Sequence, residues 1–164
     1  MAQDERTVIR HAQDAVAGSL RDYGQVLPGA VMLVGRDPET GEPLSEPRAI
    51  GMLEEHAFGS EQEMELFVGG LRAEAMRLDA LAVAFLGEAS AEVDDDEGPR
   101  RVALIRMEDR SGVQLMHAPI ERTGPFSKAG DFVASPEAPD ILEQPLLPDG
   151  SVQAAGGRKR LPVL

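Results

Sequence analysis

Six carboxylate side chains fall within ten residues, between Glu88 and Glu97. Carboxylates are ligands that Mg²⁺ and Ca²⁺ prefer, and in pairs they can act as general acid and base. Glu88 ends an apolar run that predicts a buried strand, and open α/β sheets tend to place ligands at this end of a strand. The consecutive acids from Asp94 to Glu97 repel one another, stay hydrated and precede a Gly-Pro pair, which indicates a loop.

Three interpretations of this acidic stretch stay open. The first is a hydrated connection between two strands, which the run of like charges favours. The second is a contact with a partner protein. Arg100 and Arg101 follow directly and could neutralise part of the charge. The third is a divalent-metal site, as a hydrolase would use, and its ligands would be Glu88, Asp94, Asp95 and Asp96.

Other catalytic motifs are absent from the sequence. There is no cysteine, which excludes thiolate nucleophiles, cysteine-ligated metals and disulfides. No serine lies in G-x-S-x-G, no H-E-x-x-H occurs, and the three histidines fall in separate predicted elements. The stretch GPFSKAG at 124–130 lacks the residue order of a phosphate-binding loop, so we interpret it as a turn. We therefore predict no cofactor and no catalytic residue.

The net charge of −13 limits the partners that this chain can have. Nucleic acid and anionic membranes bind clusters of Lys and Arg, so we expect neither as a partner. No apolar stretch approaches the length of a membrane-spanning helix, and the polar N-terminus lacks the apolar core of a signal peptide. We therefore expect a cytoplasmic protein whose partner is another protein or a second copy of itself.

Two amphipathic helices are predicted. In residues 4–23, apolar side chains recur at spacings of three and four, which places one face on a core: Val8, Ile9, Ala12, Val16 and Leu20. Ser60 and Glu63 form a capping box that begins a second helix, which runs to about Asp79. Gly69 and Gly70 weaken the middle of that helix. We interpret them as allowing close approach to the sheet, with a ligand passing over them as the alternative.

Apolar segments predict about five strands. Residues 30–35 and 47–55 flank a turn at DPETG, and the second of them is expected at an edge. Residues 80–89 read as a central strand covered on both faces. Residues 102–108 and 113–121 form a hairpin, in which His117 is expected to be half-buried. We therefore predict one α+β domain over residues 1–122, with two helices and a mixed or antiparallel sheet.

The composition changes after Arg122. Six of the twelve prolines lie beyond it, and five basic residues balance five acidic ones from there on, so the whole −13 belongs to residues 1–121. No helical or strand period is clear, which predicts an extended Pro-rich arm over residues 123–164. We expect this arm to lie on its own domain or on a neighbouring subunit, because a free linker would not need its apolar residues. Those proposed for partner binding are Phe126, Phe132, Ile141, Leu142, Leu146 and Leu147.

The order of a strand, a capped helix, LAVAFLGEAS and RRVALIRMEDRSG resembles a loose group of small uncharacterised α/β proteins of bacteria and their phages. In that group a hydrophobic strand ends in a Glu-Ala motif, and a hairpin beginning with Arg follows. The likeness covers about residues 30–122. It implies a fold and no activity.

These observations favour a non-enzymatic interaction or assembly protein, associated with a phage or mobile element. It would act through its acidic surface and its arm, as a homo-oligomer or bound to a basic protein. The alternative is a divalent-metal-dependent hydrolase that uses Glu88 and the nearby aspartates. A small-ligand-binding domain is a third possibility, and it rests on Gly69 and Gly70.

Overall fold

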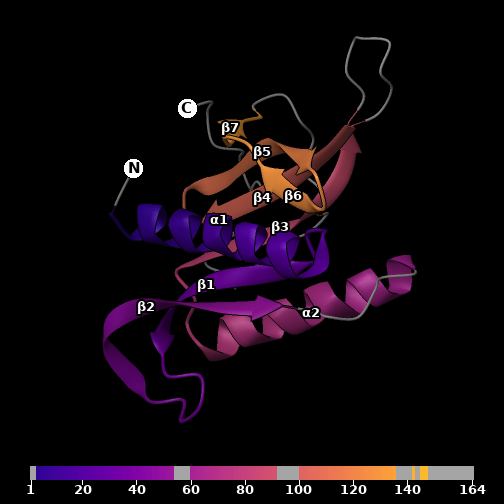
Figure 1. Cartoon of the computed structure of the whole chain (residues 1–164). Coiled ribbons are helices and arrows are strands. Elements are labelled where there is room, and N and C mark those ends of the chain that lie inside the picture. The colour runs from indigo at the N-terminus through magenta and orange to yellow at the C-terminus, as the bar shows by residue number, and fades with distance from the viewer. Residues whose placement is uncertain (1–2, 54–59, 92–99, 136–141, 143–144, 148–164) are drawn as a thin grey trace.

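A computed structural model of the chain describes residues 3–53, 60–91, 100–135, 142 and 145–147. A helix, two strands, a second helix and five strands follow one another along the sequence (Figure 1). The helices are α1 (Gln3–Tyr23) and α2 (Glu61–Arg77). The strands are β1 (Gly29–Arg36), β2 (Pro43–Leu53), β3 (Ala82–Ala91), β4 (Arg100–Asp109), β5 (Gly112–Thr123), β6 (Phe126–Ala129) and β7 (Val133–Ala134).

The seven strands form one antiparallel sheet, which confirms the predicted α+β class. The strand order is β2-β1-β3-β4-β5-β6, and β7 pairs with β5 beyond the end of β6. Strand β3 is central, as its apolar run predicts, and β2 lies at one edge. The predicted hairpin is formed by β4 and β5, in which Leu104 lies opposite His117, and His117 is half-buried as expected.

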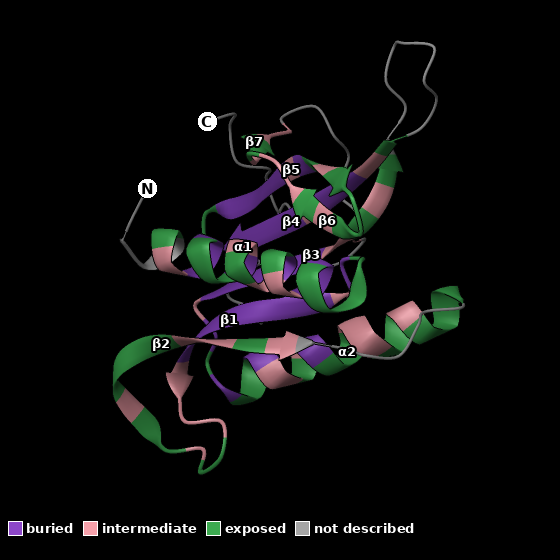
Figure 2. Ribbon diagram, viewed as in Figure 1, coloured by how far each residue is buried: buried purple, intermediate pink, exposed green. Residues whose placement is uncertain are grey.

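Helix α1 covers one face of the sheet. Its five predicted core residues are all buried there, together with alternate side chains of β1, β3 and β4 (Figure 2). Gly24 ends the helix in the left-handed conformation, with φ at 72°, and its N–H donates to the Leu20 carbonyl at 2.9 Å. The predicted N-terminal helix therefore packs on the sheet of its own chain.

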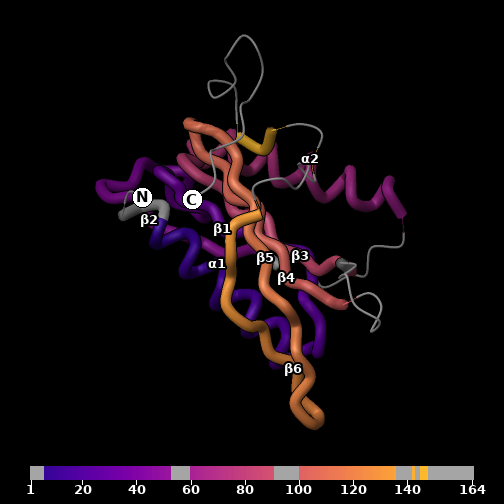
Figure 3. The backbone as a smooth tube through the Cα atoms, turned by 90° about the horizontal axis from the view of Figure 1, so that it is seen from above, coloured from indigo at the N-terminus to yellow at the C-terminus, as the bar shows by residue number. Residues whose placement is uncertain are grey.

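Helix α2 lies on the opposite face, and Figure 3 shows the sheet between the two helices. The Ser60 hydroxyl accepts the Glu63 N–H at 3.2 Å, which confirms this half of the predicted cap. Leu71, Ala75 and Leu78 are buried against β1 and β3. Met64, Phe67 and Val68 are only partly buried, and Leu66 and Met76 are exposed.

The interpretation of Gly69 and Gly70 as points of close contact with the sheet is wrong. Both glycines are exposed, and a Cβ atom built on either would meet no heavy atom within 4 Å. The apolar stripe turns toward the sheet and leaves these two positions on the solvent side. Nothing in the structure requires a glycine at either position.

The arm begins with structure that the sequence pattern did not predict. Gly124 and Pro125 form a turn, but residues 126–129, interpreted as part of that turn, form strand β6 against the end of β5. Strand β7 follows after a three-residue break. Strands of four and two residues are too short to show an apolar repeat. The surrounding prolines therefore led to the prediction of an extended arm.

Candidate functional site

Glu88 lies on β3, as predicted, but the strand continues past it to Ala91, and its carboxylate is occupied by protein groups. Arg101 on β4 binds it with two hydrogen bonds, from Nε to Oε2 at 2.7 Å and from Nη2 to Oε1 at 2.9 Å. Oε1 also accepts the Val26 N–H at 3.0 Å. The same Arg101 Nη2 donates to the Gly24 carbonyl at 2.8 Å. Glu88 and Arg101 therefore hold the connection between α1 and β1 against β3 and β4.

The environment of Glu88 favours its charged form. Partial burial of the carboxyl raises its pKa, but hydrogen bonds from Arg101 and Val26 and the arginine charge outweigh this effect. The pKa of Glu88 consequently lies below the ordinary glutamate value of 4.5. A general acid needs a raised pKa instead, so this residue is suited to holding the fold together rather than to proton transfer.

The other ligands of the predicted metal site, Asp94, Asp95 and Asp96, lie outside the described residues. Within the part of the chain that the structure describes, no group of three or more His, Asp or Glu side chains could hold a metal ion. The structure therefore does not test the predicted metal site as a whole. It shows instead that the arginine that follows the acidic stretch pairs with the glutamate that precedes it.

The six arm residues predicted to bind a partner have different surroundings. Leu146 and Leu147 are buried in the core of their own chain, beneath α2, and Leu142 packs partly against the same cluster. Ile141 lies outside the described residues. Phe132 is partly buried under α1, and Phe126 has 64% of its surface exposed. Part of the arm is therefore part of the domain, and among the described residues of this set Phe126 is the most exposed.

A buried ion pair holds the leucines in place. Arg106 and Glu108 are on β4, and their side chains are 1% and 0% exposed. Arg106 Nη1 donates to Glu108 Oε1 at 2.5 Å. The two carboxylate oxygens also accept backbone N–H groups, Oε1 from Leu146 at 3.0 Å and Oε2 from Leu147 at 2.7 Å.

This pair was missed in the sequence. Arg106 and Glu108 occupy alternate positions in a strand, a spacing typical of a solvent-facing side. Glu108 binds a segment almost forty residues later, and no local pattern predicts that contact. Their one signal is that apolar residues flank them on both sides in β4.

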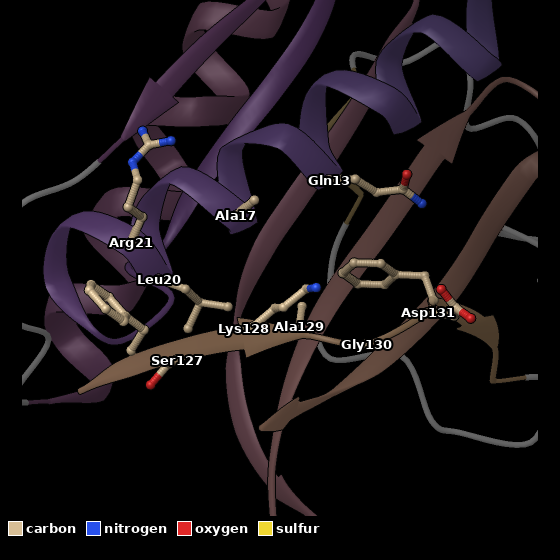
Figure 4. A pocket seen from close by; sticks show the side chains of 11 residues that line it. Gln13, Ala17, Leu20, Arg21, Ser127, Lys128, Ala129, Gly130 and Asp131 are labelled. Atoms are coloured by element: carbon tan, nitrogen blue, oxygen red, sulfur yellow. The ribbon is translucent and has the colours of Figure 1, made fainter. Parts of the chain in front are cut away.

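A cavity of about 660 Å³ opens between α1 and β6. From α1 it is lined by Gln13, Ala17, Leu20 and Arg21, and from the arm by residues 126–132. Figure 4 shows Leu20 and Lys128 between the helix and the strand. Its volume is in the range of ligand and peptide sites, and its walls combine apolar side chains with a few polar ones. We call this cavity the β6 groove.

The β6 groove lies beside a free sheet edge. Strand β6 is last in the strand order, and no described strand pairs with its outer side. An edge strand has unpaired backbone N–H and C=O groups, and another chain can add there by backbone hydrogen bonding. The lining residues Arg21 and Lys128 were not singled out in the sequence, because the first belongs to a helix predicted to pack on the core and the second to a predicted turn.

Ser135 and His117 form a second contact at the same edge. The His117 Nδ1 and the Ser135 hydroxyl are hydrogen bonded, and the Ser135 N–H donates to the Leu115 carbonyl at 2.9 Å. No described carboxylate hydrogen bonds to His117, so the arrangement lacks the third group of a catalytic triad within the described residues. Its visible effect is to fix the arm to β5 just after β7.

Neither described helix is long and apolar enough to cross a membrane. Comparison with protein-family models, with curated proteins and with solved structures found no match for this chain. The resemblance to small bacterial and phage proteins therefore stays a prediction.

Proposed function

We propose that this chain is a non-enzymatic protein-binding protein that assembles through the β6 edge of its sheet. The observation that carries the proposal is the exposed Phe126 at the mouth of the β6 groove. A large aromatic side chain gains most from burial in an interface, because it can remove a large apolar area from water. We propose no cofactor for this function.

The edge supplies the second part of the binding surface. A partner segment placed along β6 could form backbone hydrogen bonds with the strand and place apolar side chains among Leu20, Phe126 and Phe132. Backbone pairing gives affinity in this mode of recognition, and the side-chain pockets give specificity. Both are present on one side of the molecule.

Charge supports a second copy of the chain as the first partner to test. With a net charge of −13, two copies repel one another over most of their surfaces. The β6 groove has Arg21 and Lys128 in its lining against Asp131. Arg21 is paired with Asp22, so the charges around the groove nearly cancel and repulsion is weakest there. A carboxylate of a second copy can then approach Lys128 where Phe126 is exposed. The acidic remainder of the surface could still bind a basic protein.

The hydrolase alternative needs Glu88 as a metal ligand, and Arg101 already binds this carboxylate. Both oxygens of Glu88 accept hydrogen bonds within the chain, so a metal ion would have to displace Arg101. No observation on the described residues favours this function over protein binding.

Light scattering after size-exclusion chromatography tests the proposal. Wild type is expected to form dimers or larger assemblies at micromolar concentrations, and Phe126→Ser to shift at least ten-fold toward the monomer. Leu66→Ser is the matched control, because Leu66 on α2 is 72% exposed and lies away from the groove. Assembly that is equally weakened by both substitutions, or by neither, would contradict the proposal.

A further inference from the structure

The contacts of Pro145, Leu146 and Leu147 have the features of a bound peptide. Glu108 accepts the two consecutive N–H groups of the leucines, and Arg72 Nε donates to the Pro145 carbonyl at 2.8 Å. Three main-chain groups are thus bound by side chains of the domain. The two leucine side chains are 0% and 3% exposed, in an apolar cluster with residues of β1, β3 and α2.

A hydrophobic cover alone would not require this arrangement. Placing the charged Arg106 and Glu108 out of water is unfavourable, and apolar residues of similar size would serve a core at least as well. Buried ion pairs are best attested where they set one specific pairing or act in a switch. Here the carboxylate accepts two backbone N–H groups from a segment that comes 38 and 39 residues later in the chain.

The segment is also joined to the domain by a long connection. Ser135 is fixed at Leu115, and Leu115 is two residues from Val113, the cross-strand neighbour of Glu108. The two ends of the connection are therefore anchored close together. Residues 136–144 between them could span roughly 30 Å if extended. The number of residues between the two anchors therefore does not by itself force Pro145–Leu147 into this site.

We propose that the Arg106–Glu108 surface is a peptide-binding site for a partner segment with two adjacent aliphatic residues, and that Pro145–Leu147 occupies it as an internal ligand. The ligand is defined by chemistry that the structure shows. The ligand donates two consecutive backbone N–H groups to the Glu108 carboxylate and accepts a hydrogen bond from Arg72 at the carbonyl before them. It also places two leucine-sized side chains in the apolar cluster beneath α2. This inference rests on the proposed protein-binding function and adds a second, regulated site on the other face of the sheet.

A labelled peptide tests the site directly. The probe is LEQPLLP, the sequence of residues 142–148, and binding is measured by fluorescence anisotropy. The full-length variant Leu146→Ala/Leu147→Ala, whose internal ligand is weakened, should bind the peptide at least ten-fold more tightly than wild type, in which the tethered segment competes. Leu66→Ala, a change outside the site, should bind as wild type does.

A modified peptide isolates the role of Glu108 without changing the protein. Methylation of the two leucine amide nitrogens removes both N–H donors and should weaken binding at least ten-fold. Equal binding of the methylated peptide, or a folded double variant that binds no better than wild type, would overturn the proposal. A wild-type dimer that the peptide dissociates would make a second copy the occupant, and would overturn the assignment to a partner segment.

Hydrogen exchange on the wild-type chain decides the matter even if the double variant does not fold. A displaceable ligand predicts that the Leu146 and Leu147 amides exchange at least 100-fold faster than that of Ile105 in β4, because local opening exposes them. Equal rates would show that the segment opens only with the whole domain and would overturn the proposal. The Phe126 experiment probes the opposite face, so failure of one proposal is distinguishable from failure of the other.

Discussion

Glu88 and Glu108 show how two carboxylates of one sheet take different roles. Glu88 is 23% exposed and pairs with an arginine whose side chain is itself 40% exposed. Glu108 is fully buried and binds an arginine and two backbone N–H groups. Glu88 was expected from its position to belong to a functional site, but its contacts with Arg101 and Val26 stabilise the fold. Glu108 was not noticed in the sequence and is the more constrained group.

Glu88→Gln should destabilise the fold by about 1–2 kcal/mol at neutral pH, because it removes the charge from a two-bond pair with Arg101. The folded-state pKa of Glu88 is below 4.5, so its contribution is present above that pH and is lost as the pH falls through the folded pKa. The difference between variant and wild type should therefore shrink below pH 4.5. Urea unfolding at several pH values measures it.

Asp22→Asn is the control for that experiment, because the Arg21–Asp22 pair is exposed on both sides and should contribute little. A Glu88→Gln effect that stays constant down to the lowest pH measured would contradict the role given to its charge.

Glu108→Ala should destabilise the fold by roughly 3–5 kcal/mol, because it leaves the Arg106 guanidinium buried without its carboxylate. The double variant Arg106→Leu/Glu108→Leu should be less destabilised than the single one, since it removes both charges. Denaturant unfolding of this double variant and of the single variants Arg106→Leu and Glu108→Leu provides the cycle. A double variant that loses as much as the sum of the singles would show that the two charges act independently.

At the scale of elements, the helices and strands that are long enough to show an apolar repeat were predictable. Helix α1, the start of α2, the central strand and the β4–β5 hairpin all followed from apolar spacing, because each buries one repeating face against the sheet. The short strands β6 and β7 were not predictable, since pairing with β5 creates them and their own sequence has no period. The contact of Leu146 and Leu147 with Glu108 was equally hidden, because it joins positions that are far apart in the chain.

Gly69→Ala and Gly70→Ala should each stabilise the fold by about 0.5–1 kcal/mol, because both glycines are exposed in the interior of α2 and a methyl group would meet no neighbour. Thermal and urea unfolding measure the gain. Gly24→Ala is the opposing control, since its φ of 72° disfavours a side chain. Loss of stability at Gly69 or Gly70 would mean that the fold itself needs glycine there, and would contradict the open surroundings of the two positions.

At the scale of the whole molecule, the arm cannot be treated as an appendage. Deleting residues 123–164 would remove two strands of the sheet and the leucines that cover the Arg106–Glu108 pair. Such a deletion would test folding rather than assembly. Point substitutions on the exposed edge leave the core intact, and they separate the binding surface from the structure that presents it.

The central claim is that the β6 edge is where this chain binds another chain. Hydrogen exchange of the wild-type protein, compared between dilute and assembled samples, tests it most directly. We predict that the backbone amides of Phe126–Ala129 that do not bond to β5 become at least ten-fold more protected on assembly, while those on the exposed side of α2 do not change. Assembly without added protection at β6, or with protection concentrated on α2, would contradict the claim.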